Sequence, residues 1–363
     1  MNLSLFNFII VILFTVLFGW NNTVRNRRFY IWSLVIVFLL ESSLRSITVG
    51  ADTISYYYMF KDINNLTWNE IWQSFVERYF LGAGEEFDVG YTMLVYTIRC
   101  FTDSFQVFET IRNLIFFIPL GIFLNKYSRN FYQLTFAFLF YVALLHSIPI
   151  NGGRQLLAIG FGIMSFMSLE EGKRNRAIIW LIAGIPFHMS ILLCLIPIAL
   201  SFLKPKIIKG LHAFSLLLIP AVILNVNSVI VFMGYMIGSE KYAEYGKGVV
   251  AGGTATFIIL LTLLSIFCYF AFKTETLENN RLLRCMYLML PPMSFFGPLI
   301  HSNGSMIRIV MYFYLYLMLM VPFGIENFFT KDTRGAAYHI MIGALAFLMI
   351  TSGIHDYYFF WQK

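Results

Sequence analysis

The sequence predicts an all-α polytopic membrane protein with about 10–12 transmembrane helices and additional re-entrant or interfacial elements. Of its 363 residues, 59% are hydrophobic and only 12% are charged. Apolar runs long enough to cross a bilayer alternate with short polar stretches, where the basic residues gather. The net charge of +7 is therefore better explained by membrane topology than by nucleic-acid binding, and we expect one integral membrane domain over residues 1–363.

The first two apolar runs set the orientation of the chain. Leu3 to Trp20 has no basic residue ahead of it and no small-residue cleavage site, which predicts a span and not a cleaved signal. Arginines at positions 25, 27 and 28 follow it and predict a cytoplasmic loop. Phe29 to Leu44 then returns the chain to the outer face, where the acid-rich segment of about residues 45–88 is expected to form an extracytoplasmic loop.

The apolar runs in the middle of the sequence follow the same charge rule. Val89 to Phe101 is short and polar for a span, and we expect it to lie in the membrane interface. The next three runs are predicted to cross inward, outward and inward again: Phe105 to Leu124, Phe131 to Ile148, and Leu156 to Leu169. This order places Arg154 at the outer face.

The run from Ala177 to Leu203 is predicted to be a re-entrant hairpin broken at Pro186. A single span would put the lysines at positions 204, 206 and 209 outside, against the charge rule. A hairpin keeps them inside and leaves His188 near its tip. Non-helical backbone is allowed at that depth where it lines a cavity.

The remaining apolar runs complete the topology. They are His212 to Gly238, Thr254 to Phe272, Leu288 to Ile300, Met306 to Ile325, and Tyr338 to Ser352. The whole chain then has about ten spans, one hairpin and one interfacial helix. The four cysteines lie far apart without zinc or redox spacing, and no glycine-rich phosphate loop is present, so we expect neither a metal nor a cofactor.

The predicted topology gathers charged residues at the outer face, where they are candidates for a catalytic site. Arg154, Lys241 and Arg308 have cationic groups of the kind that hold a diphosphate, and they could neutralise a diphosphate leaving group without a metal. The candidates for a general base are Asp52, Glu86, Asp88 and His188. From these two groups we predict that Asp52, His188 and Arg154 are catalytic.

Aromatic and polar residues near these charges are predicted to bind substrate. Arg308, Tyr312 and Tyr316 are spaced four apart, so on one helix they would form a stripe suited to a phosphate followed by a sugar. The other predicted substrate contacts are Tyr56, Tyr91, Gln155, Tyr242, Glu86 and Asp88. The alternative for any single tyrosine is the interfacial aromatic belt, and for Arg154 it is a snorkelling anchor.

Six short motifs follow one another along nearly the whole chain. They are Val49-Gly50-Ala51-Asp52-Thr53, Asp88-Val89-Gly90-Tyr91, Gly153-Arg154-Gln155-Leu156, Phe187-His188-Met189-Ser190, Lys241-Tyr242-Ala243-Glu244-Tyr245, and Arg308 ahead of Tyr312. In this order and spacing they resemble the EpsG family of bacterial polysaccharide polymerases, relatives of the Wzy O-antigen polymerases. The chain departs from the family pattern at Gly152-Gly153, where an isoleucine or similar residue is expected ahead of the arginine.

The resemblance implies a fold like that of C-type glycosyltransferases and a place in the bacterial cytoplasmic (inner) membrane. It implies an enzyme of capsule or exopolysaccharide synthesis that moves a growing glycan from undecaprenyl diphosphate to the non-reducing end of a lipid-linked repeat unit at the outer face. The implied partners are the undecaprenyl-diphosphate-linked oligosaccharide, the lipid bilayer, a flippase and a chain-length regulator, and no nucleic acid.

Three other functions remain open on the sequence alone. A lipid-linked oligosaccharide transporter would also need cations, but at mid-membrane within an inverted repeat that this sequence lacks. A membrane acyltransferase with His188 as its base would leave Arg154, Lys241 and Arg308 unused. An O-antigen ligase would share the chemistry of the polymerase and differ only in its acceptor.

Overall fold

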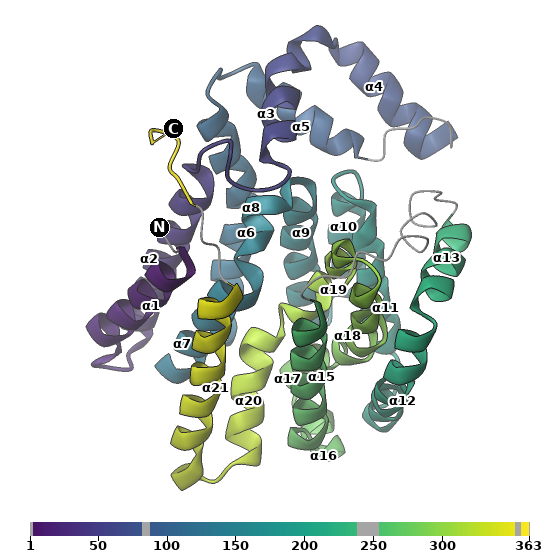
Figure 1. The fold of residues 1–363 in the computed structure, drawn as a ribbon. Helices are drawn as coiled ribbons and strands as arrows, with labels where there is room; N and C mark the ends of the chain where they lie inside the picture. The colour runs from purple at the N-terminus through teal and green to yellow at the C-terminus, as the bar shows by residue number, and fades with distance from the viewer. Residues whose placement is uncertain (1–2, 82–87, 238–253, 353–356, 363) are drawn as a thin grey trace. The chain divides into compact units, whose positions relative to one another are not determined.

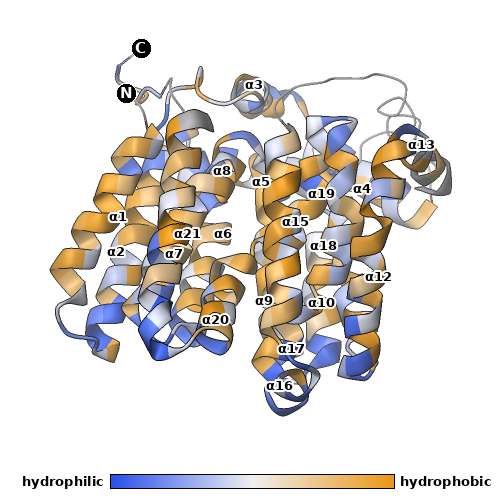
Figure 2. Ribbon diagram, turned by 60° about the horizontal axis from the view of Figure 1, so that its bottom comes forward, coloured by the Kyte–Doolittle hydropathy of each residue, from blue (hydrophilic) through white to orange (hydrophobic). Residues whose placement is uncertain are grey.

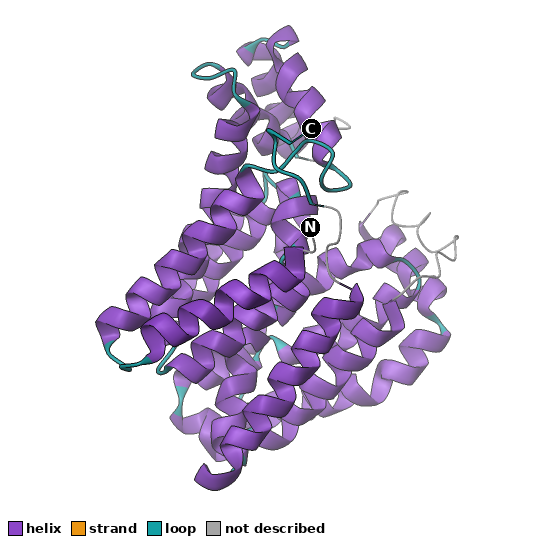
Figure 3. Ribbon diagram, turned by 60° about the vertical axis from the view of Figure 1, so that its left-hand side comes forward, coloured by secondary structure: helices purple, strands orange, loops and turns teal. Residues whose placement is uncertain are grey.

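The computed structural model describes residues 3–81, 88–237, 254–352 and 357–362 (Figure 1). Hydrophobic residues make up most of the helices, and hydrophilic residues gather toward the helix ends (Figure 2). Over the described residues, the regular structure is helical apart from one isolated bridge between Arg45 and Phe359 (Figure 3). The predicted all-α polytopic fold class is therefore confirmed.

Five helical segments among the described residues are long and apolar enough to cross a bilayer. They are Phe105–Tyr127, Phe131–Asn151, Pro205–Leu224, Arg281–His301 and Lys331–Ile350. A sixth is added if Gly304–Tyr314 and Leu317–Phe328, which are bent by 55° relative to each other, form one broken span. Shorter apolar helices occupy other predicted runs, at Leu3–Gly19, Met189–Leu200 and Ala255–Ala271. The total of about ten spans stays a prediction, because length and composition alone do not assign these shorter helices.

The chain forms two compact units, residues 1–192 with 338–363, and residues 193–337. Helices of the first unit are α1 (Leu3–Gly19), α2 (Val24–Ser43), α3 (Thr53–Asp62), α4 (Trp68–Val76), α5 (Val89–Arg99), α6 (Phe105–Tyr127), α7 (Phe131–Phe140), α8 (Ser147–Asn151), α9 (Gly153–Glu170), α10 (Arg174–Gly184) and most of α21 (Lys331–Ser352). Helices of the second are α11 (Leu195–Leu200), α12 (Pro205–Leu224), α13 (Val226–Ile237), α15 (Thr254–Ala271), α16 (Thr274–Asn279), α17 (Arg281–Tyr287), α18 (Leu290–Phe296), α19 (Ile307–Tyr314) and α20 (Leu317–Phe328). The expectation of one integral membrane domain stays a prediction.

Local signals fix the ends of the two helices that support the site. Ser104 Oγ accepts a hydrogen bond from the Val107 amide at 3.4 Å and caps the start of α6. α9 ends before Gly172, whose φ of 83° lies in the left-handed region that favours glycine. At the same end, Lys126 of α6 pairs with Glu171 at 2.8 Å, which ties the last turns of α6 and α9 together.

α9 packs closely against α6 on one side and α10 on the other. At Gly160, an added Cβ would collide with the carbonyl oxygen of Ile115, so the backbones of α9 and α6 touch at this level. On the other side, Ser165 Oγ donates to the carbonyl oxygen of Ala177 at 2.9 Å. α6, α9 and α10 therefore form one closely packed layer of the first unit.

The helix breaks where the sequence predicts, around Pro186. α10 ends at Gly184, and the 3-10 helix η4 (Met189–Cys194) follows. The side chain of Ile191 lies against Gly184, where an added Cβ would meet its Cδ1 atom. Residues seven apart in an unbroken helix are separated by about 10.5 Å, so the chain must turn sharply between them. The break is confirmed, and the side of the membrane on which the following lysines lie stays a prediction.

The second unit is held together by a buried polar cluster. His212 of α12 shares hydrogen bonds with the Tyr287 hydroxyl at 2.7 Å and with Ser265 Oγ at 2.8 Å. Two basic residues bond to backbone at helix ends: Arg284 donates to the Leu203 carbonyl at 2.7 Å, and Lys209 donates to the Phe272 carbonyl at 2.7 Å. These cations satisfy carbonyl groups that a helix end leaves without partners.

The predicted stripe of Arg308, Tyr312 and Tyr316 is interrupted. α19 ends at Tyr314, and Tyr316 lies in the break before α20 begins at Leu317. The bend of 55° removes the regular four-residue spacing after Tyr312, so Tyr316 does not continue the stripe. Tyr312 and Tyr316 are both buried, at 3% exposure each.

Candidate active site

Three of the predicted site residues meet in the first unit. Arg154 Nη1 lies 2.8 Å from Asp88 Oδ2, and His188 Nδ1 lies 3.5 Å from Asp88 Oδ1. The side chains of Arg154 and His188 are 44% and 22% exposed, whereas that of Asp88 is only 6% exposed. We call these residues the open ionic cluster: a buried carboxylate holds a cation and an imidazole that both reach an accessible surface.

A close backbone contact brings Asp88 to His188. Gly90, in the first turn of α5, donates its amide hydrogen to the Pro186 carbonyl at 2.9 Å. A Cβ at Gly90 would lie 2.5 Å from Pro186 Cβ, so only glycine allows this approach. Asp88 directly precedes α5 and His188 follows the break at Pro186, so this contact fixes the distance between them.

A second glycine places Arg154. A Cβ at Gly153 would lie 2.5 Å from the Tyr56 ring and 2.9 Å from Arg112 Nη1. Gly153 thus makes room for Tyr56 and Arg112 where α9 begins. Tyr56 in turn lies within electrostatic reach of Arg154, and its ring centre lies 5.4 Å from that of Tyr91.

Asp52 lies at the start of α3, in a turn that is fixed by a distant residue. Gly50 has a φ of 99°, and the amide of Ala51 donates to Asn151 Oδ1 at 2.8 Å. Because Asn151 stands three residues before Arg154, this bond anchors the Asp52 turn to the start of α9. The side chain of Asp52 is half-buried, and its role as a base stays a prediction.

A second group of charges, which sequence reasoning missed, is completely buried. Glu109 of α6 pairs with Arg45 at 2.5 Å and with Arg112 at 2.8 Å, and all three side chains are at most 1% exposed. Arg112 also donates to the Pro149 carbonyl at 3.0 Å. We call Arg45, Glu109 and Arg112 the buried ionic network. Its signal in the sequence was a Glu-x-x-Arg pair, three residues apart on one helix face, within an otherwise apolar run.

The buried network and the open cluster share neighbours. The guanidinium carbon of Arg112 lies 5.8 Å from the centre of the Tyr56 ring, and Tyr56 also lies within electrostatic reach of Arg154. Tyr91, which is fully buried, lies within the electrostatic reach of both arginines. Tyr56 and Tyr91 therefore lie near both groups of charges, and their role as substrate contacts stays a prediction.

The remaining predicted residues lie elsewhere. Glu86, Lys241 and Tyr242 are outside the described residues. Gln155 is buried in α9, at 3% exposure. Arg308 is exposed in the first turn of α19, in the second unit, and its approach to Arg154 stays a prediction. The described residues contain no group of three or more His, Cys, Asp or Glu side chains placed to hold a metal ion.

The fold and this geometry define a class: a polytopic helical membrane protein with an accessible cation, a carboxylate and a histidine in contact. The EpsG family model matches residues 28–363, nearly the whole chain, and the protein therefore belongs to the EpsG family. EpsG-like proteins are Wzy-type polymerases, which places this chain in polysaccharide biosynthesis at a membrane. The comparisons with curated proteins and with solved structures found no match.

Proposed function

We propose that this protein is a polysaccharide polymerase of the bacterial cytoplasmic membrane. It transfers a growing glycan from undecaprenyl diphosphate to the non-reducing end of a lipid-linked repeat unit at the outer face. The observation that carries the proposal is the contact of Arg154, Asp88 and His188, with distances of 2.8 and 3.5 Å to the shared carboxylate. A leaving diphosphate needs a cation, and an attacking hydroxyl needs a base.

In the proposed reaction, the acceptor hydroxyl oxygen forms a bond to the anomeric carbon of the donor. The bond between that carbon and the diphosphate oxygen breaks, and its electron pair leaves with the diphosphate. Asp88 faces Nδ1 of His188 and orients the ring, so Nε2 takes the hydroxyl proton. The 3.5 Å separation is longer than a hydrogen bond, and contacts of this kind commonly shorten when substrate binds.

Arg154 is suited to the diphosphate because Asp88 and Tyr56 engage only part of its guanidinium. An arginine has five N–H donors, and 44% of this side chain is accessible. Its planar fork can hold two phosphate oxygens, which a lysine cannot do. Arg308 and Lys241 are proposed to complete the clamp, with Tyr312 and Tyr242 beside them. A flippase that supplies the repeat units and a chain-length regulator are the proposed protein partners.

The test is polymerisation by purified protein supplied with lipid-linked repeat units. Arg154→Ala should lower the rate by about 10²–10³-fold, the cost of one lost donor to a developing oxyanion, and Arg154→Lys should keep part of the activity. Arg176→Ala, which removes an exposed arginine from the first turn of α10, is the matched control. Near-normal polymerisation by a stably inserted Arg154→Ala protein would return Arg154 to the role of a snorkelling anchor.

The alternatives give different products in the same system. A ligase would attach the glycan to a different acceptor and leave the repeat units unpolymerised. A transporter would move labelled lipid across vesicles without forming a glycosidic bond, and in a deletion strain single repeat units would stay at the inner leaflet. An acyltransferase would depend on an acyl donor that the polymerase does not use.

A further inference from the structure

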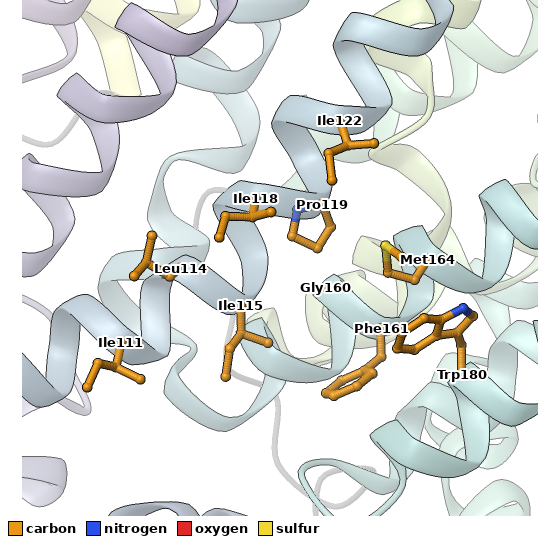
Figure 4. A pocket seen from close by; sticks show the side chains of 10 residues that line it. All are labelled: Ile111, Leu114, Ile115, Ile118, Pro119, Ile122, Gly160, Phe161, Met164 and Trp180. Atoms are coloured by element: carbon orange, nitrogen blue, oxygen red, sulfur yellow. The ribbon is translucent and has the colours of Figure 1, made fainter. Parts of the chain in front are cut away.

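An apolar groove of about 410 Å³ lies between α6, α9 and α10 (Figure 4). Isoleucines of α6 form one wall, the side chains of two α9 residues form the other, and an indole of α10 closes it: Ile111, Ile118, Ile122, Phe161, Met164 and Trp180. Ile111, Ile118 and Ile122 are each more than a third exposed, at 37%, 43% and 38%. A volume of this size is typical of small-molecule sites, and the exposed rim allows entry from the side.

The directions of α6, α9 and α10 show which end of the groove faces the open ionic cluster. Arg112 contacts Gly153 and Ile115 contacts Gly160, so α6 and α9 proceed in the same direction from their arginines. α10 runs the opposite way, because Ala177 at its start bonds to Ser165, whereas Gly184 at its end lies beside the earlier residue Phe161. The end of α10 therefore leads back toward His188, and the open ionic cluster lies at one end of the groove.

The spacing matches a ligand with a charged head and a long apolar tail. Phe161 and Met164 follow Arg154 by seven and ten residues in α9, which corresponds to about 10–15 Å along the helix. Phe161 also stacks on Phe187, the residue before His188, with ring centres 5.5 Å apart. A head held by Arg154 would thus direct its tail past this pair of rings into the groove.

We propose that the groove binds the part of the polyprenyl chain that follows its first two isoprene units, counted from the diphosphate. The inference rests on the proposed function and adds the segment of the substrate that these residues recognise. Lipid tails are as apolar as the groove, so burial in it yields no hydrophobic gain over the bilayer. Recognition comes from the fit of branched isoprene methyl groups between isoleucine and aromatic side chains, where many small dispersion contacts add up.

The kinetic test blocks the groove with a larger side chain and compares substrates whose prenyl chains differ in length. Ile118→Trp places an indole in the groove. Ile179→Trp is the control, because Ile179 of α10 is 62% exposed and does not line the groove. With undecaprenyl-linked repeat units, Ile118→Trp should raise KM about tenfold by displacing those contacts. With a geranyl chain, too short to reach Met164, its KM should equal that of the parent protein. Equal KM values for the two variants with undecaprenyl substrates would overturn the proposal.

A binding test separates the groove from the proposed function. Undecaprenyl diphosphate with a diazirine near its head should label residues 111–122 or 160–164 in the parent protein and in Ile179→Trp, and much less in Ile118→Trp. Unlabelled undecaprenyl diphosphate should compete, and phosphatidylglycerol should not. Equal competition by phosphatidylglycerol would make the groove a general lipid contact. If the parent labels as expected but polymerises neither substrate, the groove stands and the polymerase proposal fails.

Discussion

The open ionic cluster and the buried ionic network contain the same kinds of charge but differ in access. In the network, two arginines enclose Glu109, and the three side chains are at most 1% exposed. In the cluster, the carboxylate of Asp88 is buried while Arg154 and His188 reach an accessible surface. Charges that only neutralise one another within a protein can be sealed from solvent, whereas charges that act on a substrate must reach it.

The difference also separates two roles in one region. The buried network contacts the Pro149 carbonyl through Arg112 and the Thr53 hydroxyl through Arg45, at 3.0 and 3.3 Å, so it joins α6 to α8 and to the first residue of α3. Asp52 directly precedes α3, and Arg154 is the second residue of α9, which follows α8. We infer that the network positions the backbone on which the open cluster stands. Catalysis and stability measured on the same variants should therefore distinguish the two groups.

The largest expected effect is the loss of catalysis in His188→Ala. Removing a general base typically costs about 10²–10⁴-fold in rate, and the loss should fall on kcat rather than on KM, because the base acts in the transition state. The apparent Tm should stay within a few degrees of the parent value. Asp52→Asn is the comparison, because a larger fall in kcat for this variant would identify Asp52, and not His188, as the general base.

Glu109→Gln should act on stability instead. The change leaves Arg45 and Arg112 buried without their carboxylate, and breaking such a pair costs about 3–5 kcal/mol. Thermal unfolding in detergent should show a clear fall in Tm, which Glu278→Gln, at an exposed position of α16, should not. A Glu109→Gln protein with parent stability and no turnover would place Glu109 with the catalytic groups, contrary to the separation drawn above.

Gly90→Ala should weaken catalysis without removing any charge. Its Cβ would lie 2.5 Å from Pro186 Cβ, so α5 must shift and carry Asp88 away from His188. Misplacing reacting groups by about 1 Å can cost up to about 100-fold, and we expect a loss of about ten- to a hundredfold in kcat. Gly210→Ala, where no atom lies within 4 Å of the added methyl group, should keep full activity. Unchanged turnover in Gly90→Ala would separate Asp88 from the mechanism.

The sequence was sufficient for features that depend on composition or on local signals. Apolar runs predicted the fold class, Pro186 predicted the break, and the cost of charge in lipid drew attention to Arg154 and His188. The buried network was missed because Glu109 and Arg112 lie within a run whose mean hydropathy is apolar. Their partner Arg45 lies 64 positions before Glu109, so no local spacing indicated the pair. The bend before α20 has no glycine or proline at Leu315 or Tyr316, so no local residue announced it.

The smallest effect is expected at Tyr56, which touches both groups of charges. Its hydroxyl lies within electrostatic reach of Arg154, and its ring centre lies 5.8 Å from the Arg112 guanidinium carbon. Tyr56→Phe keeps the ring beside the network and removes only the hydroxyl near the cluster. A polar contact of hydrogen-bond strength contributes about 0.5–1.5 kcal/mol, so kcat/KM should fall about two- to twelvefold while Tm changes little. Tyr58→Phe, on an exposed face of the same helix, provides the control. A fall in Tm with unchanged kcat/KM would assign Tyr56 to the buried network alone, and Arg154 would then need another residue to orient it toward the diphosphate.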